Sequence, residues 1–136
     1  MKVGTDISVL AEEGRSDAAV LADHLKLADL AEPLGFDSLF GLEHHFTGYS
    51  MSPHPLQLLS YYAGKTKRIT LGTCVIVLPW HDPIRVAEET ATLDHMTKGR
   101  CFVGEFGFGA QTVEQLRHQS IVALRTVQGD ARQLAV

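Results

Sequence analysis

Long apolar runs are missing from this sequence. The longest largely apolar stretch, residues 74–80, has seven residues, whereas a helix that crosses a membrane needs roughly twenty. A secretion signal is also missing, because Asp6 stands where a signal peptide would have its apolar region. We therefore expect neither a membrane-spanning segment nor a cleaved leader.

Cysteine and basic charge are scarce as well. The two cysteines, Cys74 and Cys101, lie in segments with the pattern of strands, which favours buried free thiols over a disulfide framework. Twelve Lys and Arg residues face sixteen Asp and Glu residues, for a net charge of −4. A nucleic-acid-binding protein needs a basic face, so this charge balance argues against nucleic-acid binding. A cytoplasmic protein is expected.

Apolar residues, by contrast, are plentiful enough for one core. They make up 45% of the sequence, an ordinary value for a globular protein with a core. The length of 136 residues predicts a single domain over residues 1–136. Strand patterns at 2–8, 38–42, 69–78 and 101–104 alternate with helix patterns at 17–34, 55–63, 83–96 and 112–128. This alternation predicts parallel strands covered by helices, either a small doubly wound sheet or half of an eight-stranded barrel.

Several single residues predict where the helices begin and end. We expect Ser16 and Asp82 to cap the first and third helices, and Gly35, Gly64 and Gly99 to end the first three. The expected apolar faces include Leu27, Leu30 and Leu34 in the first helix. In the third helix they include Ile84, Ala87, Ala91 and Met96 or their neighbours.

The segment Glu43-His44-His45-Phe46 offers the richest chemistry, because it directly follows the second predicted strand. Active sites of parallel α/β proteins lie at the carboxyl ends of the strands. A histidine there can act as a general acid or base near neutral pH, with the glutamate orienting it. The alternative is that these polar groups only cap the loop through hydrogen bonds to the backbone.

Two further chemistries have weaker support. His44, His45, His54 and His81 could converge on a metal, but the sequence has no HExxH or paired-cysteine motif, and adjacent histidines in an extended segment point in opposite directions. We therefore predict no metal site. The glycine-rich run 104–109 could approach a phosphate or simply form a tight turn, and it lacks the GxGxxG spacing.

Three stretches together carry a family pattern. They are GFD at 35–37 followed by EHHFT at 43–47, KRITLGT at 67–73 followed by VLP at 77–79, and HDPIRVAE at 81–88 with LDHM at 93–96 and GR at 99–100. In this order and at this spacing, residues 1 to about 104 resemble the bacterial luciferase-like flavin monooxygenases. The resemblance implies a TIM-barrel-type α/β fold, here limited to about four strand–helix units.

The resemblance also implies a function and its site. It implies a monooxygenase that uses reduced flavin, FMN or alternatively a deazaflavin, and O2 to oxidise an aldehyde or another small organic substrate. His44 matches the catalytic histidine of the family. Thr73, Cys74 and Val75 match the strand end where the family holds a non-proline cis peptide against the flavin. Glu43 is expected at the cofactor, and His45 and Phe46 in the substrate pocket or at a subunit contact.

Two departures from the family pattern set up a competing hypothesis. The family follows its fourth strand with an arginine that helps to bind the flavin phosphate, but no arginine follows Gly104 in residues 105–108. A complete barrel takes roughly 250 residues, far more than this chain has. Open sheet edges would favour a homodimer, and a separate reductase would supply reduced flavin. The competing hypothesis is a non-catalytic remnant that binds flavin or only self-associates.

Overall fold

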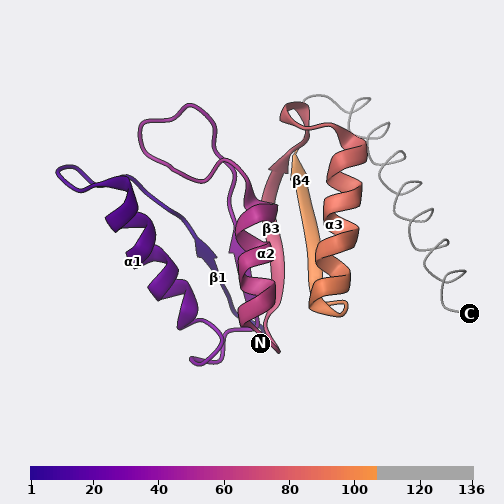
Figure 1. Ribbon diagram of the computed structural model, residues 1–136. Helices are drawn as coiled ribbons and strands as arrows, with labels where there is room; N and C mark the ends of the chain where they lie inside the picture. Colours follow the sequence, from indigo (N-terminus) through magenta and orange to yellow (C-terminus); the bar gives the residue numbers. More distant parts are fainter. Residues whose placement is uncertain (107–136) are drawn as a thin grey trace, which may run out of the picture.

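The computed structural model describes residues 1–106 (Figure 1). Strands and helices alternate along the chain: β1 (Gly4–Ile7), α1 (Asp17–Asp29), β2 (Ser38–Gly41), α2 (Pro55–Lys65), β3 (Thr70–Val77), a 3-10 turn η1 (Leu78–Trp80), α3 (Pro83–Thr97) and β4 (Cys101–Phe106). The helix expected at 112–128, and the glycines Gly107 and Gly109, lie outside the described residues. No helix within residues 1–106 is long and apolar enough to cross a membrane.

The four strands form one parallel sheet in the order β1-β2-β3-β4. The helices α1, α2 and α3 pack against one face of this sheet. A doubly wound sheet places helices on both faces and reverses its strand order, whereas a barrel adds strands in sequence with every helix outside. The structure therefore decides between the two predicted architectures in favour of half a barrel.

The core lies between the sheet and this single layer of helices. Because side chains alternate along a strand, Ile7, Leu39 and Leu71 point toward the helices and are almost fully buried. From the helices, Val20 and Leu59 meet them. The remaining large buried side chains are Val9, Tyr62, Ile69, Ile76, Leu78 and Leu93.

The opposite face of the sheet is the one that a closed barrel would enclose. Phe40 on β2 and Phe102 on β4 lie on this inner face, with their rings edge to face and 5.4 Å apart. A Cβ atom on Gly4 would collide with the ring of Phe40, and one on Gly72 with the ring of Phe102. The two glycines therefore leave room for the aromatic rings to lie across neighbouring strands.

The predicted starts of the first and third helices are confirmed. The hydroxyl of Ser16 accepts a hydrogen bond from the backbone N–H of Ala19 and caps α1. The carboxylate of Asp82 accepts from the N–H groups of Ile84 and Arg85 and caps α3. Both residues satisfy first-turn donors that have no partner within the helix.

Several expected helix ends and faces are wrong. Helix α1 ends at Asp29, before Leu34, and Gly64 lies inside α2, which ends at Lys65. The helix-facing side of one sheet can bury only a narrow stripe of each helix, so part of each wider predicted stripe stays exposed. The exposed residues are Leu27, Leu30 and Leu34 around α1, and Ile84 and Met96 in α3. The expected Ala87 and Ala91 of α3 are buried, together with Val86 and Leu93.

The cysteines also differ from expectation. Both are free, as predicted, but Cys74 is exposed on β3 and only Cys101 is half-buried. Cys74 is exposed because it lies on the inner face of the sheet, opposite the helices, and not in the layer that forms the core.

Candidate active site

The carboxyl ends of β2 and β3 lie side by side and bring two loops together. Gly41 pairs with Thr73 in the parallel register, so residues 42–54 after β2 and 78–82 after β3 leave the sheet from the same edge. Figure 1 shows both segments above the same end of the sheet. This is the edge where parallel α/β folds place their active sites.

Glu43 is the centre of a hydrogen-bonded cluster at this edge. Its side chain is fully buried, and its Oε1 lies 2.5 Å from Nε2 of His45 and 2.9 Å from Nε2 of His81. Its other oxygen, Oε2, accepts a hydrogen bond of 3.0 Å from the backbone N–H of Val77. Both oxygens of a buried carboxylate are thus paired, as burial of a charge requires. The cluster joins the loop after β2 to the end of β3.

The same contacts control the charge of Glu43. Burial on its own would raise the pKa of this carboxyl, but the hydrogen bonds from His45, from the N–H of Val77 and from His81 hold the pKa below its ordinary value. The carboxylate is therefore the favoured form of Glu43. It can accept from both imidazoles at once.

Aromatic rings hold the two histidines of the cluster in place. The ring of His45 stacks on Trp80 with centroids 5.0 Å apart, and Phe46 lies 5.7 Å from the same Trp80 ring. His81 meets the ring of His54 edge to face at 5.7 Å. The side chain of Phe46 itself is almost fully exposed, at 94%. It therefore presents an apolar surface to solvent beside the cluster.

His44 has a different set of partners from His45. Its Nδ1 lies 3.4 Å from the hydroxyl of Tyr49, and its backbone N–H donates to the carbonyl of Ser52 at 2.9 Å. The hydroxyl of Ser52 in turn donates to the carbonyl of Leu42 at 2.7 Å. The structure thus separates the two adjacent histidines, as the sequence predicts for an extended segment.

The three residues predicted at the flavin lie inside β3, just before and within its irregular stretch between Thr73 and Ile76, and not at the end of the strand as expected. The peptide bond between Cys74 and Val75 is cis, at the position where the family resemblance implies one. The hydroxyl of Thr73 is buried, donates to the carbonyl of Gly104 and accepts from its N–H, which joins β3 to β4. The side chain of Cys74 is exposed and that of Val75 is half-buried, so both have surface available for contact.

These strand ends fit one part of a flavin better than the other. Leu42, Cys74 and Val75 offer uncharged, partly exposed surface suited to a flat ring. Within residues 1–106, Arg15 and Arg85 are the arginines in loops or first helical turns that follow strand ends. Arg15 pairs with Glu12 and Asp23, and Arg85 with Glu88. The described strand ends therefore fit the ring of a flavin but offer no free arginine for its phosphate.

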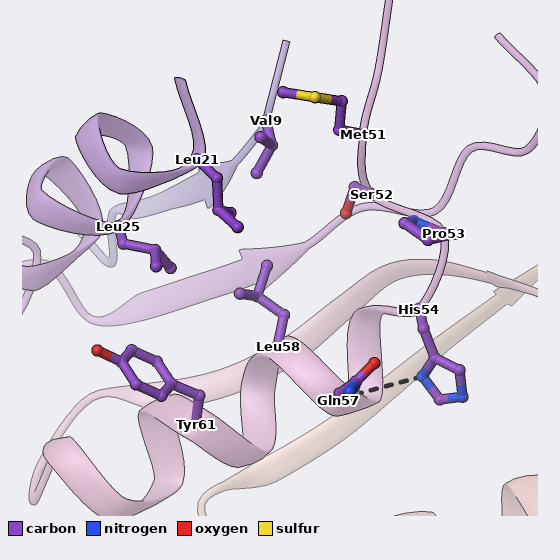
Figure 2. A pocket seen from close by; sticks show the side chains of 10 residues that line it. All are labelled: Val9, Leu21, Leu25, Met51, Ser52, Pro53, His54, Gln57, Leu58 and Tyr61. Atoms are coloured by element: carbon purple, nitrogen blue, oxygen red, sulfur yellow. Dashed lines mark hydrogen bonds between the residues drawn. The ribbon is translucent and has the colours of Figure 1, made fainter. Parts of the chain in front are cut away.

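A groove lies outside this edge, between α1 and α2 (Figure 2). It has a volume of about 330 Å³, and its walls include Leu21 and Leu25 from α1 and Leu58 and Tyr61 from α2. None of the predicted site residues lines it. The groove is on the helix side of the sheet, so we place the chemistry at the strand ends and not here.

Sequence reasoning gave no site role to three residues that the structure brings to the site. Trp80 stacks on His45, Tyr49 reaches His44, and His81 binds Glu43. His81 appeared only among four histidines considered for a metal. A usable signal was present, because His81 follows the third strand by a few residues just as His45 follows the second, and parallel strand ends meet at one edge.

Comparisons with known proteins agree with this geometry. A family model described as luciferase-like monooxygenase matches residues 1–125. The alkanal monooxygenase alpha chain of Photorhabdus luminescens is 38% identical over 100 residues, which cover 74% of this chain and 28% of that protein. The 4-hydroxyprotoasukamycin monooxygenase of Streptomyces nodosus subsp. asukaensis is 36% identical over 101 residues, 74% of this chain and 27% of that protein.

Solved structures give the same result. The oxygenating constituent of 3,6-diketocamphane monooxygenase from Pseudomonas putida, solved in complex with FMN, matches with a TM-score of 0.71 and 26% identity. The match covers 85% of this chain and 32% of that one. The chain thus spans roughly 30% of the length of these relatives. It belongs to the luciferase-like monooxygenase family of flavin-dependent enzymes, and its described residues 1–106 hold four parallel strands and three helices of such a barrel.

Proposed function

We propose that the chain provides the acid–base side of a flavin-dependent monooxygenase site that oxidises an aldehyde or another small organic substrate. The observation that carries the proposal is the pair of histidines after β2, one held by Glu43 and the other left with an available imidazole. They lie at the carboxyl ends of the strands of a luciferase-like half-barrel, the end where such folds place their active sites. The alkanal monooxygenase relative supports an aldehyde as the first substrate class to test.

His44 is the proposed acid–base residue. The hydrogen bond that its backbone N–H donates to the carbonyl of Ser52 fixes its position, and the hydroxyl of Tyr49 contacts its Nδ1. The other ring nitrogen, Nε2, is then left to take a proton from the substrate or return one. An imidazole can both accept and donate a proton in general acid–base catalysis, which suits it to both steps.

The proposed cofactor is FMN in its reduced form. When bound, a reduced flavin supplies the electrons that activate O2. Thr73, Cys74 and Val75 are proposed to contact it from within β3, with Glu43 supporting them from the loop after β2. His45 and Phe46 are proposed to border the substrate. The FMN complex of the relative from Pseudomonas putida supports FMN over a deazaflavin. The deazaflavin remains the alternative cofactor.

We also propose a homodimer and a separate flavin reductase as partners. Support for self-association comes from β1 and β4, which are the edge strands of the described sheet. Exposed edges and apolar side chains favour association. Light scattering at micromolar concentration should give the mass of a dimer, and a clean monomer would contradict this part of the proposal.

A second candidate function is a non-catalytic module that binds flavin or only associates with itself. The observation that favours it is the chemistry of the fourth strand end, where residues 105–108 contain no arginine for the flavin phosphate. The absence of a free arginine at the other described strand ends points the same way.

The two candidates are separated by one series of measurements. The full chain is titrated with FMN while flavin fluorescence is followed, and gel filtration of the mixture shows whether the complex is oligomeric. Turnover is then measured with aldehydes of increasing chain length and an added flavin reductase. His44→Ala should lower turnover at least about a hundredfold with FMN affinity unchanged, and His95→Ala is the control. FMN binding without turnover would support the second candidate.

A further inference from the structure

We propose that Glu43, His45 and His81 form a binding site for a divalent transition metal, with Zn²⁺ as the reference ion. This inference does not depend on flavin chemistry. One ligand atom from each residue lies within 4.8 Å of the others. The donors are two imidazole nitrogens and one carboxylate oxygen, a set that Zn²⁺ and Fe²⁺ use in sites that keep a position open for water.

The geometry of the cluster needs little change to accept an ion. Both Nε2 atoms point at the same oxygen, Oε1 of Glu43, from 2.5 Å in His45 and 2.9 Å in His81. In a tetrahedral zinc site, ligand atoms about 2.0–2.2 Å from the ion lie about 3.3 Å from one another. Nε2 of His45 would have to move away from Oε1 by about 0.8 Å and Nε2 of His81 by about 0.4 Å to reach this spacing. The ion would then lie where the two imidazoles now meet the carboxylate.

The surroundings also support a site that is held in advance and open to solvent. Val77 donates its backbone N–H to Oε2 of Glu43, which leaves Oε1 to face the histidines. Trp80 stacks on His45, and His54 packs against His81. The side chains of His45 and His81 are 19% and 14% exposed while that of Glu43 is fully buried. An ion can thus enter from the solvent side onto a fixed carboxylate.

The proposal corrects the sequence argument in one respect. The histidines at 44, 45, 54 and 81 do not converge as a set of four, because His44 faces Tyr49 and His54 caps α2. The set that converges is two of them with Glu43 as the third ligand. A bound ion would join the loop after β2 to the turn after β3, and would leave His44 free for acid–base work.

The test is a calorimetric titration of the full, tag-free chain with Zn²⁺ after treatment with EDTA. We expect one ion per chain with a dissociation constant in the micromolar range or tighter. His81→Ala and Glu43→Gln should each weaken binding at least about tenfold, because each removes a charged or donor ligand. His44→Ala and His95→Ala are matched controls that remove a histidine outside the cluster and should keep the affinity.

A second measurement distinguishes loss of the metal ligands from misfolding of a variant. Co²⁺ bound by imidazole nitrogen gives visible absorption bands, and these should be strong in the parent chain and lost in His81→Ala. Circular dichroism must show that His81→Ala keeps its secondary structure. Failure to bind at high micromolar Zn²⁺, equal binding by His81→Ala, or equal weakening by His95→Ala would overturn the proposal. None of these outcomes bears on FMN binding, so the two proposals fail separately.

Discussion

The carboxylate of Glu43, two residues after β2, is tied to the backbone of Val77, the last residue of β3. Its Oε2 accepts the Val77 N–H at 3.0 Å, across 34 positions of the sequence. The bond fixes where the histidine-bearing loop leaves the sheet relative to β3, which carries Cys74 and Val75. The predicted acid–base group and the predicted flavin contacts thus share one support.

Replacing Glu43 by alanine should destabilise the fold. The change leaves the partly buried N–H of Val77 without its acceptor and takes the shared partner from His45 and His81. Loss of a buried hydrogen-bond acceptor costs about 1–3 kcal/mol. We expect a fall of this size in the free energy of unfolding, measured by urea denaturation, and a smaller fall for Glu43→Gln, whose amide can still accept one bond. The exposed Glu13→Ala is the control and should change stability little.

Glu32 should make the stability of the protein fall in acid. Burial would raise the pKa of this carboxyl, but hydrogen bonds from the backbone N–H groups of Ile69, Arg68 and Lys67 outweigh burial and lower the pKa below its ordinary 4.5. A lowered pKa means that the native state favours the carboxylate. The stabilisation is therefore present above about pH 4.5 and is lost as pH falls through the native pKa.

To test this, the free energy of unfolding of the parent chain and of Glu32→Gln is measured from neutral pH to the lowest pH at which the parent chain still folds. The parent should be more stable near neutral pH, and the difference should shrink as the carboxyl becomes protonated. A stability difference that stays constant, or that grows toward acid pH, would contradict this assignment. Glu13→Gln, which removes an exposed carboxyl, provides the baseline.

The sequence predicted the order of elements and the helix starts because these depend on local chemistry. Ser16 and Asp82 each bond to backbone groups within three residues, so their role can be read without a fold. The helix faces were harder. Leu27, Leu30 and Leu34 are apolar at helical spacing, but whether a leucine is buried depends on where the sheet lies, and periodicity alone does not contain this information.

The site shows the same division between local and distant information. The placement of Glu43, His44 and His45 after a strand was predicted from their positions in the chain. The partnership of Glu43 with His81 was not, because the two residues are 38 positions apart and meet only through the parallel register of β2 and β3. Both residues follow the carboxyl end of a strand by a few positions, and this shared position is the signal in the sequence that predicts the pair.

Cys101 should be a slow-reacting thiol. Burial raises its pKa to about 11, and the nearby charge of Asp94 adds to the effect. At mildly alkaline pH the thiolate that attacks an alkylating reagent is therefore scarce at Cys101, while Cys74 is exposed. Iodoacetamide labelling read by mass spectrometry at pH 8 should modify Cys74 first. Cys74→Ser should leave only the slow reaction, whose rate should rise steeply toward pH 11.

The raised pKa of Cys101 should also make the protein less stable at alkaline pH. A raised pKa in the native state means that the stabilisation from Cys101 is complete below the pKa of the unfolded thiol, near 8.5, and is lost as pH rises through about 11. Cys101→Ala should remove this loss. Equal alkaline sensitivity of the parent and of Cys101→Ala would show that another group is responsible.

Gly72 should tolerate no side chain unless Phe102 is made smaller. A Cβ at Gly72 would overlap the ring of Phe102, which also packs edge to face on Phe40. Gly72→Ala should therefore lower the free energy of unfolding by about 1–3 kcal/mol, the usual cost of overpacking. Combining it with Phe102→Leu should recover part of the loss, because the collision is with the ring itself.

The matched control for Gly72→Ala is Gly64→Ala. Gly64 lies inside α2, and a Cβ there would meet nothing within 4 Å. Alanine should stabilise this position by about 0.5–1 kcal/mol because it restricts the unfolded chain and favours the helix. Opposite signs at the two glycines would show that the inner-face rings, and not a general effect of removing glycine, set the requirement at Gly72. If Gly72→Ala is also stabilising, Phe102 does not lie across β3 as described.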